Sequence, residues 1–190
     1  IFGGFLVISG ASDFVIEVSK VVAGRIRGGS AFVAVLSSAL TGTISGSAVA
    51  NTASTGVITI PLMKSSGFRG RFAGGVEAAA STGGQLMPPI MGAGAFVMAS
   101  YTAIPYSTIV SVSIMPAVIY FLSVASAVRI EAVKYRVGEG IDMRVSRAKI
   151  LAGALTFIIP LTVMIYFLMA GVTPSFAASA STAVLIGVSW

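Results

Sequence analysis

Three long stretches of the chain contain no charged residue: 28–63, 78–128 and 150–190. Only 9% of the 190 residues are charged, whereas 56% are hydrophobic. A soluble domain usually carries about 25% charged residues. Long apolar runs are typical of membrane-spanning helices, and not of the short alternating strands of an outer-membrane barrel. We therefore expect an all-α integral membrane protein.

The chain carries twelve basic and six acidic residues, and the basic ones gather between the charge-free stretches. The three groups are Lys20, Arg25 and Arg27; Lys64, Arg69 and Arg71; and Arg129, Lys134, Arg136, Arg144, Arg147 and Lys149. Basic loops of membrane proteins face the cytoplasm, so the uncharged loops near 99–107 and 170–175 are expected outside. The positive charge then belongs to loops, and no nucleic-acid partner is expected. Because Ile1 and Trp190 lie inside apolar stretches, we interpret 1–190 as one membrane fragment of a longer permease.

Residues 28–63 must leave the cytoplasm and return to it. They are too few for two full crossings of about 20 residues each and a turn. Their middle, residues 41–55, is also too polar to face lipid. We therefore predict a re-entrant hairpin with half-helices near 30–44 and 48–63, and an irregular tip that protein or water must cover.

The charge pattern also divides the rest of the chain. We expect a short amphipathic helix at 12–24 in the membrane interface, with Ser12 as its N-cap. Its predicted apolar face is Phe14, Val18, Val21 and Val22, opposite Asp13, Glu17 and Lys20. The other predicted segments are a broken crossing helix at 72–99, a crossing helix at 106–128, a cytoplasmic loop at 129–149, a crossing helix at 150–170 and the start of another at 175–190.

A first polar patch occupies the predicted hairpin tip. It consists of Ser45, Gly46, Ser47, Asn51, Thr52, Ser54 and Thr55. One interpretation is helix packing, because Gly42 and Gly46 have the spacing of small residues at membrane helix contacts. The other is an ion or substrate site, because half-helix ends that face each other expose unpaired backbone groups. Both interpretations remain open at this point.

A second polar patch, residues 81–94, lies in the middle of a crossing segment. It contains Gly83 and Gly84, followed by Pro88 and Pro89. Each proline lacks an N–H and crowds the preceding turn, and the residue before each is driven toward extended geometry. One proline would suffice for a kink, so we predict a full break near 82–90 that frees backbone carbonyls.

Two short, interrupted apolar segments in one chain are typical of the central site of a transporter. The chemistry of the two patches favours sodium over protons as the ion whose gradient drives such a transporter. Neither patch contains Asp, Glu, Lys or Arg, and a proton relay needs titratable groups. Hydroxyl, amide and carbonyl oxygens suit a hard cation instead. Glu77 is the one charged residue between 72 and 128, and we expect it in the first turns of its helix, at the cytoplasmic interface.

We expect the tip and the break to face each other and to share one sodium ion. Each unpaired backbone group in the hydrocarbon region costs several kcal/mol, and a shared cation would satisfy both broken stretches. The predicted ligands are Ser45, Ser47 and Asn51 from the tip, and the carbonyls of Thr82, Gly83, Gly84 and Gln85 from the break.

Read together, the motifs resemble the large permease subunit of TRAP transporters over essentially the whole chain, most closely the type in which small and large membrane subunits are fused. They are Ser45-Gly-Ser-Ala-Val-Ala-Asn-Thr, Ile60-Pro-Leu-Met-Lys64, Phe72-Ala-Gly-Gly-Val-Glu77 and Ser81-Thr-Gly-Gly-Gln-Leu-Met-Pro-Pro-Ile-Met91. The resemblance implies a multi-pass protein of the bacterial inner membrane that imports carboxylates with the sodium gradient. It implies a periplasmic substrate-binding protein and a small membrane subunit, or its fused equivalent, as partners, besides membrane lipid.

The resemblance further implies an elevator-type transport domain built from two inverted repeats, of which this chain would be the first. We assign substrate contacts to Asn51, Thr52, Ser81 and Pro88. A binding-protein-independent divalent-anion/sodium symporter and a passive channel are the alternatives. An enzyme is not expected, because the chain has no histidine to activate Ser45 or Ser47. No cofactor is expected other than the coupling sodium ion.

Overall fold

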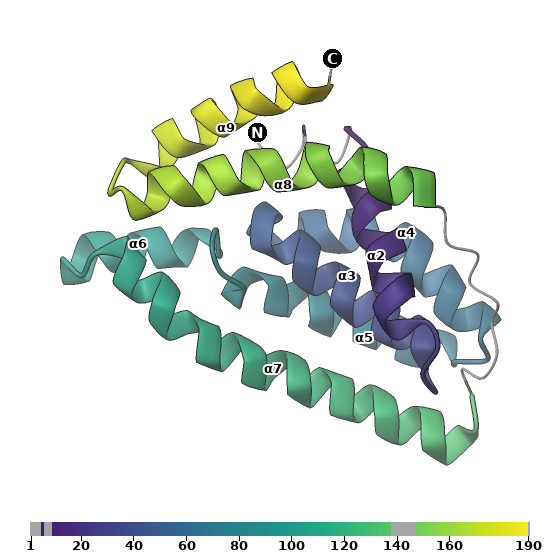
Figure 1. Ribbon diagram of the computed structural model, residues 1–190. Helices are drawn as coiled ribbons and strands as arrows, with labels where there is room; N and C mark the ends of the chain where they lie inside the picture. Colours follow the sequence, from purple (N-terminus) through teal and green to yellow (C-terminus); the bar gives the residue numbers. More distant parts are fainter. Residues whose placement is uncertain (1–4, 6–8, 138–146, 190) are drawn as a thin grey trace.

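The computed structural model describes residues 5, 9–137 and 147–189, and every regular element in these ranges is helical (Figure 1). The elements are α2 (Ala11–Ala23), α3 (Gly29–Ser45), α4 (Ala48–Ser65), α5 (Gly70–Gly83), η1 (Gly84–Leu86), α6 (Ala93–Thr102), α7 (Tyr106–Tyr135), α8 (Arg147–Met169) and α9 (Pro174–Ser189). The predicted all-α class is therefore confirmed. The predicted loop at 129–149 falls partly on 138–146, which lie outside the described residues.

Helices α3 and α4 form a tight antiparallel hairpin, with only Gly46 and Ser47 between them. Gly46 ends α3 at a φ of 58°, a left-handed conformation that glycine adopts without a steric penalty. Ser47 begins α4 by accepting a hydrogen bond from the Ala50 N–H at 3.3 Å. At 1.5 Å per residue each arm is about 26 Å long, a little shorter than a bilayer core of about 30 Å. The geometry suits a hairpin that does not cross, although its depth in the membrane stays a prediction.

The segment after the hairpin is helical at both ends and interrupted in the middle. Helix α5 ends at Gly83, one 3-10 turn follows, and α6 begins only at Ala93. The interruption thus covers residues 84–92, against a predicted 82–90. Residues 87–92 include both prolines, which cannot donate a backbone hydrogen bond to a continuing helix.

Helix α7 is the one helix in the described part of the chain that is long and apolar enough to cross a membrane. It continues to Tyr135, so the prediction that helix gives way to loop at residue 129 was wrong. Val128 and Ala132 are fully buried in a cluster with residues of α3 and α5, and this packing keeps the last two turns helical despite their charges. Helices α8 and α9 follow as a second antiparallel pair (Figure 1).

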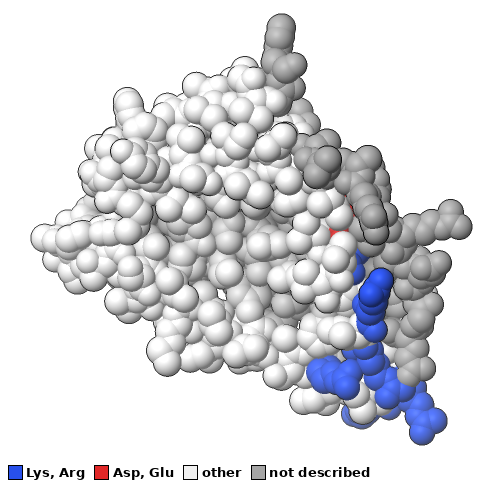
Figure 2. Space-filling model, in the orientation of Figure 1, with Lys and Arg blue, Asp and Glu red and all other residues white. Residues whose placement is uncertain are grey.

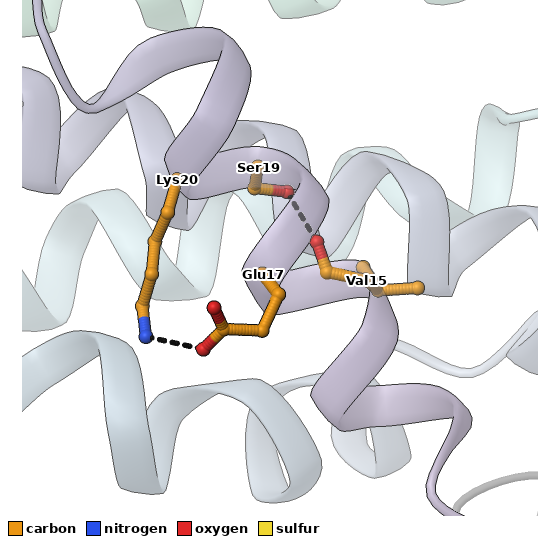
Figure 3. A network of polar contacts seen from close by, with 4 residues as sticks. All are labelled: Val15, Glu17, Ser19 and Lys20. Carbon is orange, nitrogen blue, oxygen red and sulfur yellow. Dashed lines mark hydrogen bonds and ion pairs between the residues drawn. The ribbon is translucent and has the colours of Figure 1, made fainter. Parts of the chain in front are cut away.

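Helix α2 differs from its prediction in its cap. The helix begins at Ala11 after Gly10, which has a φ of 85° and makes no side-chain cap, so Ser12 is not the N-cap. Val15, Ile16 and Ser19 are buried against α3 and α8, whereas Val21 and Val22 of the predicted apolar face are 54% and 65% exposed. Its place in the membrane interface stays a prediction. Figure 3 shows that Lys20 Nζ pairs with Glu17 Oε1 at 2.8 Å and that Ser19 Oγ donates to the Val15 carbonyl at 2.7 Å.

Basic side chains gather at the end of the molecule where the α3–α4 hairpin opens, and the opposite side shows no charge (Figure 2). At this end the Arg69 guanidinium lies 4.3 Å from the ring centre of Tyr135, and Arg129 Nη1 donates to the Arg27 carbonyl at 3.4 Å. The C-terminal end of α7 therefore packs beside the base of the hairpin. The hairpin tip points away from the charged end, toward the break after α5 (Figure 1).

Candidate functional site: the hairpin tip and the helix break

The hairpin tip and the helix break are in direct contact. The Ile90 N–H donates to the Thr43 carbonyl at 3.4 Å, and Ile44 and Ile90 belong to the same buried cluster, with residues of α2, α8 and α9. A Cβ added to Gly46 would overlap the Met91 carbonyl oxygen, so the two backbones touch there. Small residues at the tip are what allow this approach.

A second close approach joins α3 to the 3-10 turn, at Gly42 and Gly84. A Cβ on Gly84 would lie 2.9 Å from Gly42 Cα and 2.8 Å from Asn51 Nδ2. The sequence offered helix packing and ion binding as alternative explanations of the Gly42 and Gly46 spacing. The structure shows the packing contact and places the polar side chain of Asn51 against it, so the two explanations do not exclude each other.

Asn51 lies in the first turn of α4 and is fully buried. Its Nδ2 donates to the Ser38 carbonyl at 2.8 Å, whereas its Oδ1 accepts no hydrogen bond from any residue that the structure describes. Ser45 Oγ and Thr41 Oγ1, one turn apart on α3, are likewise buried without a described partner. A buried oxygen without a donor costs free energy, and a cation would satisfy it.

The other predicted tip residues have different surroundings. Ser47 uses its hydroxyl to cap α4, as described above, and is half-buried. Thr52 is half-buried in the next turn. Among the tip residues, Ser45 and Asn51 therefore have the side-chain oxygens best suited to a cation.

The predicted ligands of the break are backbone carbonyls, and at least three of them already accept hydrogen bonds. The Thr82 carbonyl accepts from the Gly84 N–H. The Gly84 carbonyl accepts from the Met87 N–H at 3.2 Å, and the Gln85 carbonyl from the Gly92 N–H at 2.8 Å. Each carbonyl oxygen keeps a second lone pair for a cation. The side chains of Thr82 and Gln85 are exposed, whereas Gly83 and Gly84 are buried.

Tyr106, the first residue of α7, was missed by the sequence analysis. Its hydroxyl lies 2.8 Å from the Pro89 carbonyl and 2.7 Å from the Ile90 carbonyl, and its one proton can be donated to either. The ring stacks on Phe96 with centroids 4.6 Å apart. Carbonyls that the prolines free from helical bonding are therefore partly satisfied by a neighbouring helix.

Glu77, which the sequence analysis expected in the first turns of its helix at the cytoplasmic interface, is completely buried among helices in the third turn of α5. Its carboxylate accepts hydrogen bonds from four hydroxyls, those of Ser38, Thr55, Thr59 and Ser81. Ser81, predicted as a substrate contact, is itself fully buried in this network, whereas Pro88 is half-buried at the break. Neither patch contains an ionisable residue of the kind that a proton relay needs, but contacts across helices place the Glu77 carboxylate beside both of them.

A comparison with known protein families identifies the family to which this chain belongs. The sequence model described as the tripartite ATP-independent periplasmic transporter, DctM component, matches residues 1–190. The chain belongs to the DctM family. Its members are permeases of membrane transport and not enzymes, so the expectation that the chain is not an enzyme is confirmed. Membership in the DctM family also argues against the binding-protein-independent divalent-anion/sodium symporter, an alternative that the sequence left open.

Three curated relatives are similar to parts of this DctM chain. The C4-dicarboxylate TRAP transporter large permease protein of Pseudomonas aeruginosa is 37% identical over 101 residues, which are 53% of this chain and 22% of the relative. Two proteins of Haemophilus influenzae, named provisionally as TRAP transporter large permease proteins, are 38% and 35% identical over 80 residues. These two matches cover 42% of this chain and 20% and 19% of the relatives. The chain thus spans about a fifth of the length of the relatives that it matches.

Proposed function

We propose that the chain forms part of a permease that imports organic acids across the bacterial inner membrane with the sodium gradient. The family supports transport by a tripartite periplasmic system, and the name of the Pseudomonas relative supports dicarboxylates as the substrate class. In this proposal a periplasmic substrate-binding protein delivers the carboxylate, and a small membrane subunit, separate or fused, completes the permease. The chain would supply the first of two inverted repeats of an elevator-type transport domain.

The observation that carries the proposal is the pairing of two interrupted stretches around buried, unsatisfied oxygens. Asn51 Oδ1 and Ser45 Oγ have no described hydrogen-bond partner, and both lie next to the contact of the tip with the break. Broken helices that meet in this way supply the coupling-ion sites of many secondary transporters. We place the sodium site there, with Ser47 and the carbonyls of Thr82–Gln85 as the remaining candidate ligands.

We propose that the substrate binds at the same place, the contact of the hairpin tip with the helix break. Its carboxylate would be bound by backbone N–H groups at the start of α4, where the helix dipole is positive, with Asn51 and Thr52. Pro88 would border the carboxylate on the side of the break. Ser81, the fourth proposed substrate residue, would contribute to the site from its place in the Glu77 network. Its hydroxyl already donates to the Glu77 carboxylate at 3.1 Å.

The proposed orientation places the open base of the α3–α4 hairpin in the cytoplasm, because the basic side chains gather there (Figure 2). Cysteines that replace Ile26 and Ser65, both exposed at the two ends of the hairpin, should react with an impermeant thiol reagent from the cytoplasmic side only. The chain itself contains no cysteine. A cysteine at Thr102, the exposed last residue of α6, is the control and should react from the periplasmic side. Labelling of Ser65→Cys from outside would contradict the hairpin.

The function is tested by replacing Asn51 in the complete permease. Asn51→Ala should raise the sodium concentration for half-maximal uptake about tenfold, because one polar contact with a charged group contributes about 1.5–3 kcal/mol. Uptake is measured in proteoliposomes with the binding protein and labelled dicarboxylate, over a series of sodium concentrations. Ser54→Ala is the matched control, since Ser54 Oγ donates only to the Asn51 carbonyl within the same helix. If both variants keep the sodium dependence of the wild type, the tip is packing alone.

A further inference from the structure

The carboxylate of Glu77 joins three helices through hydroxyl groups. Its Oε1 accepts from Ser38 Oγ of α3 at 3.0 Å, from Thr55 Oγ1 of α4 at 2.5 Å and from Ser81 Oγ of α5 at 3.1 Å. Its Oε2 accepts from Thr59 Oγ1 of α4 at 2.5 Å. The donors therefore come from both arms of the hairpin and from the first half of the broken helix.

No arginine or lysine among the described residues forms an ion pair with Glu77. A buried carboxylate is costly unless hydrogen bonds replace its water, and here hydroxyls provide them. Each of these side chains is itself fully buried. A helix contact could be made with apolar residues at no such cost, so a fully satisfied polar network in this position points to a requirement other than packing.

The network reaches the ion site through Asn51. Ser38, whose hydroxyl donates to Glu77, also offers its carbonyl to Asn51 Nδ2 at 2.8 Å. Thr55 Oγ1, the closest donor to Glu77 Oε1, also lies 2.8 Å from the Asn51 carbonyl, one turn away. Both residues that touch Asn51 in this network are thus held by the same carboxylate oxygen.

These bonds also fix which way the Asn51 amide is turned. Its nitrogen must face the Ser38 carbonyl, because two oxygens in that position would repel each other. The opposite orientation would place Nδ2 where Oδ1 now lies and would remove the oxygen from the ion site. The position of Ser38 therefore determines whether Asn51 presents an oxygen or an N–H group.

We propose that Glu77 is a positioning residue of the ion site. Through Ser38, whose carbonyl accepts from Asn51 Nδ2, and through Thr55, which contacts the Asn51 backbone carbonyl, it holds Asn51 with Oδ1 free to bind the cation. The inference rests on the proposed function, since it assigns the organisation of the same sodium site. Glu77 does not touch the ion. Its carboxylate sets the affinity for sodium by keeping one ligand in the required orientation, and it ties the hairpin to α5 in the same arrangement.

The test separates positioning from a structural role through the sodium affinity. Glu77→Gln puts an amide N–H₂ in place of one acceptor oxygen and should raise the sodium concentration for half-maximal uptake about fivefold. The maximal rate at saturating sodium, divided by the amount of permease in the proteoliposomes, should stay within about twofold. A purely structural residue would lower the amount or the maximal rate and leave the half-saturating concentration unchanged.

Substitutions of Thr55 test the same effect on sodium affinity in a second way. They remain informative even if the Glu77→Gln variant does not fold. Thr55→Val keeps the shape but removes the hydroxyl, and it should raise the half-saturating sodium concentration, whereas Thr55→Ser should restore it. Thr162→Val is the matched control, because the Thr162 hydroxyl is exposed and donates only to the carbonyl four residues before it. The double variant Glu77→Gln/Asn51→Ala should show no greater shift than Asn51→Ala alone.

The outcomes distinguish this inference from the function on which it rests. A wild-type permease without sodium dependence would overturn both. A sodium-dependent wild type in which Thr55→Val and Glu77→Gln keep the normal half-saturating concentration would overturn the positioning role alone. Shifts in both variants, with Thr55→Ser and Thr162→Val unchanged, would establish it.

Discussion

Replacing Gly84 by leucine is expected to abolish uptake. A Cβ at this position would already lie 2.8 Å from Asn51 Nδ2 and 2.9 Å from Gly42 Cα, distances that side-chain carbons do not tolerate. The obstacle on one side is backbone, which cannot turn away as a flexible side chain can. A leucine must therefore separate the 3-10 turn from α3 or displace the Asn51 amide, and either change removes the proposed ion site.

Gly75→Leu is the matched control for this variant. Gly75 lies two turns earlier in α5, and a Cβ there meets no atom within 4 Å. Both substitutions remove a glycine from the same segment, so they share the effect on backbone freedom and differ in what the side chain meets. Dicarboxylate uptake and the amount of folded permease are measured for both. Uptake by Gly84→Leu at the level of Gly75→Leu would show that the close approach is not needed for transport.

The sequence predicted the elements around the site better than it predicted their packing. Pro88 and Pro89 act on their own backbone, so a break could be inferred from local chemistry alone. The tip likewise followed from the polar run around Asn51 and from the short length between basic groups. These features depend on neighbours in the chain, which the sequence displays directly.

Contacts between distant parts of the chain could not be predicted in this way. Glu77 was expected at an interface because it is the one charge in a long apolar region, yet its partners Ser38 and Thr55 are 39 and 22 residues away. The hydroxyl of Tyr106 reaches the Pro89 carbonyl across 17 positions. Nothing in the sequence near either residue shows these partners.

The face of α2 that packs on other helices could not be predicted from its apolar residues. Val21 and Val22 were assigned to the apolar face of an interfacial helix, which does not identify the residues that contact protein. In a membrane protein lipid can cover apolar side chains as well as protein can, so hydrophobicity does not identify the buried face. Val15, Ile16 and Ser19 are buried instead, and one of the three is polar.

Replacing sodium by choline should remove almost all uptake, and this is the second large effect that we expect. The tip and the break offer hydroxyl, amide and carbonyl oxygens, which suit a hard cation and cannot bind choline through its methyl groups. The carboxylate of Glu77, beside the contact of the tip with the break, accepts hydrogen bonds from four hydroxyls of the described residues. We therefore expect sodium, and not a proton, to drive transport.

The central claim is tested most directly by the driving ion of uptake in proteoliposomes that contain the complete permease, with its binding protein outside. At fixed pH, an inward sodium gradient should drive accumulation of labelled dicarboxylate, and equimolar choline should reduce it to the level of empty vesicles. Sodium-independent uptake that does not saturate would indicate a channel. Full accumulation driven by a pH gradient alone, without sodium, would contradict the account and would make Glu77 the group that carries the coupling proton.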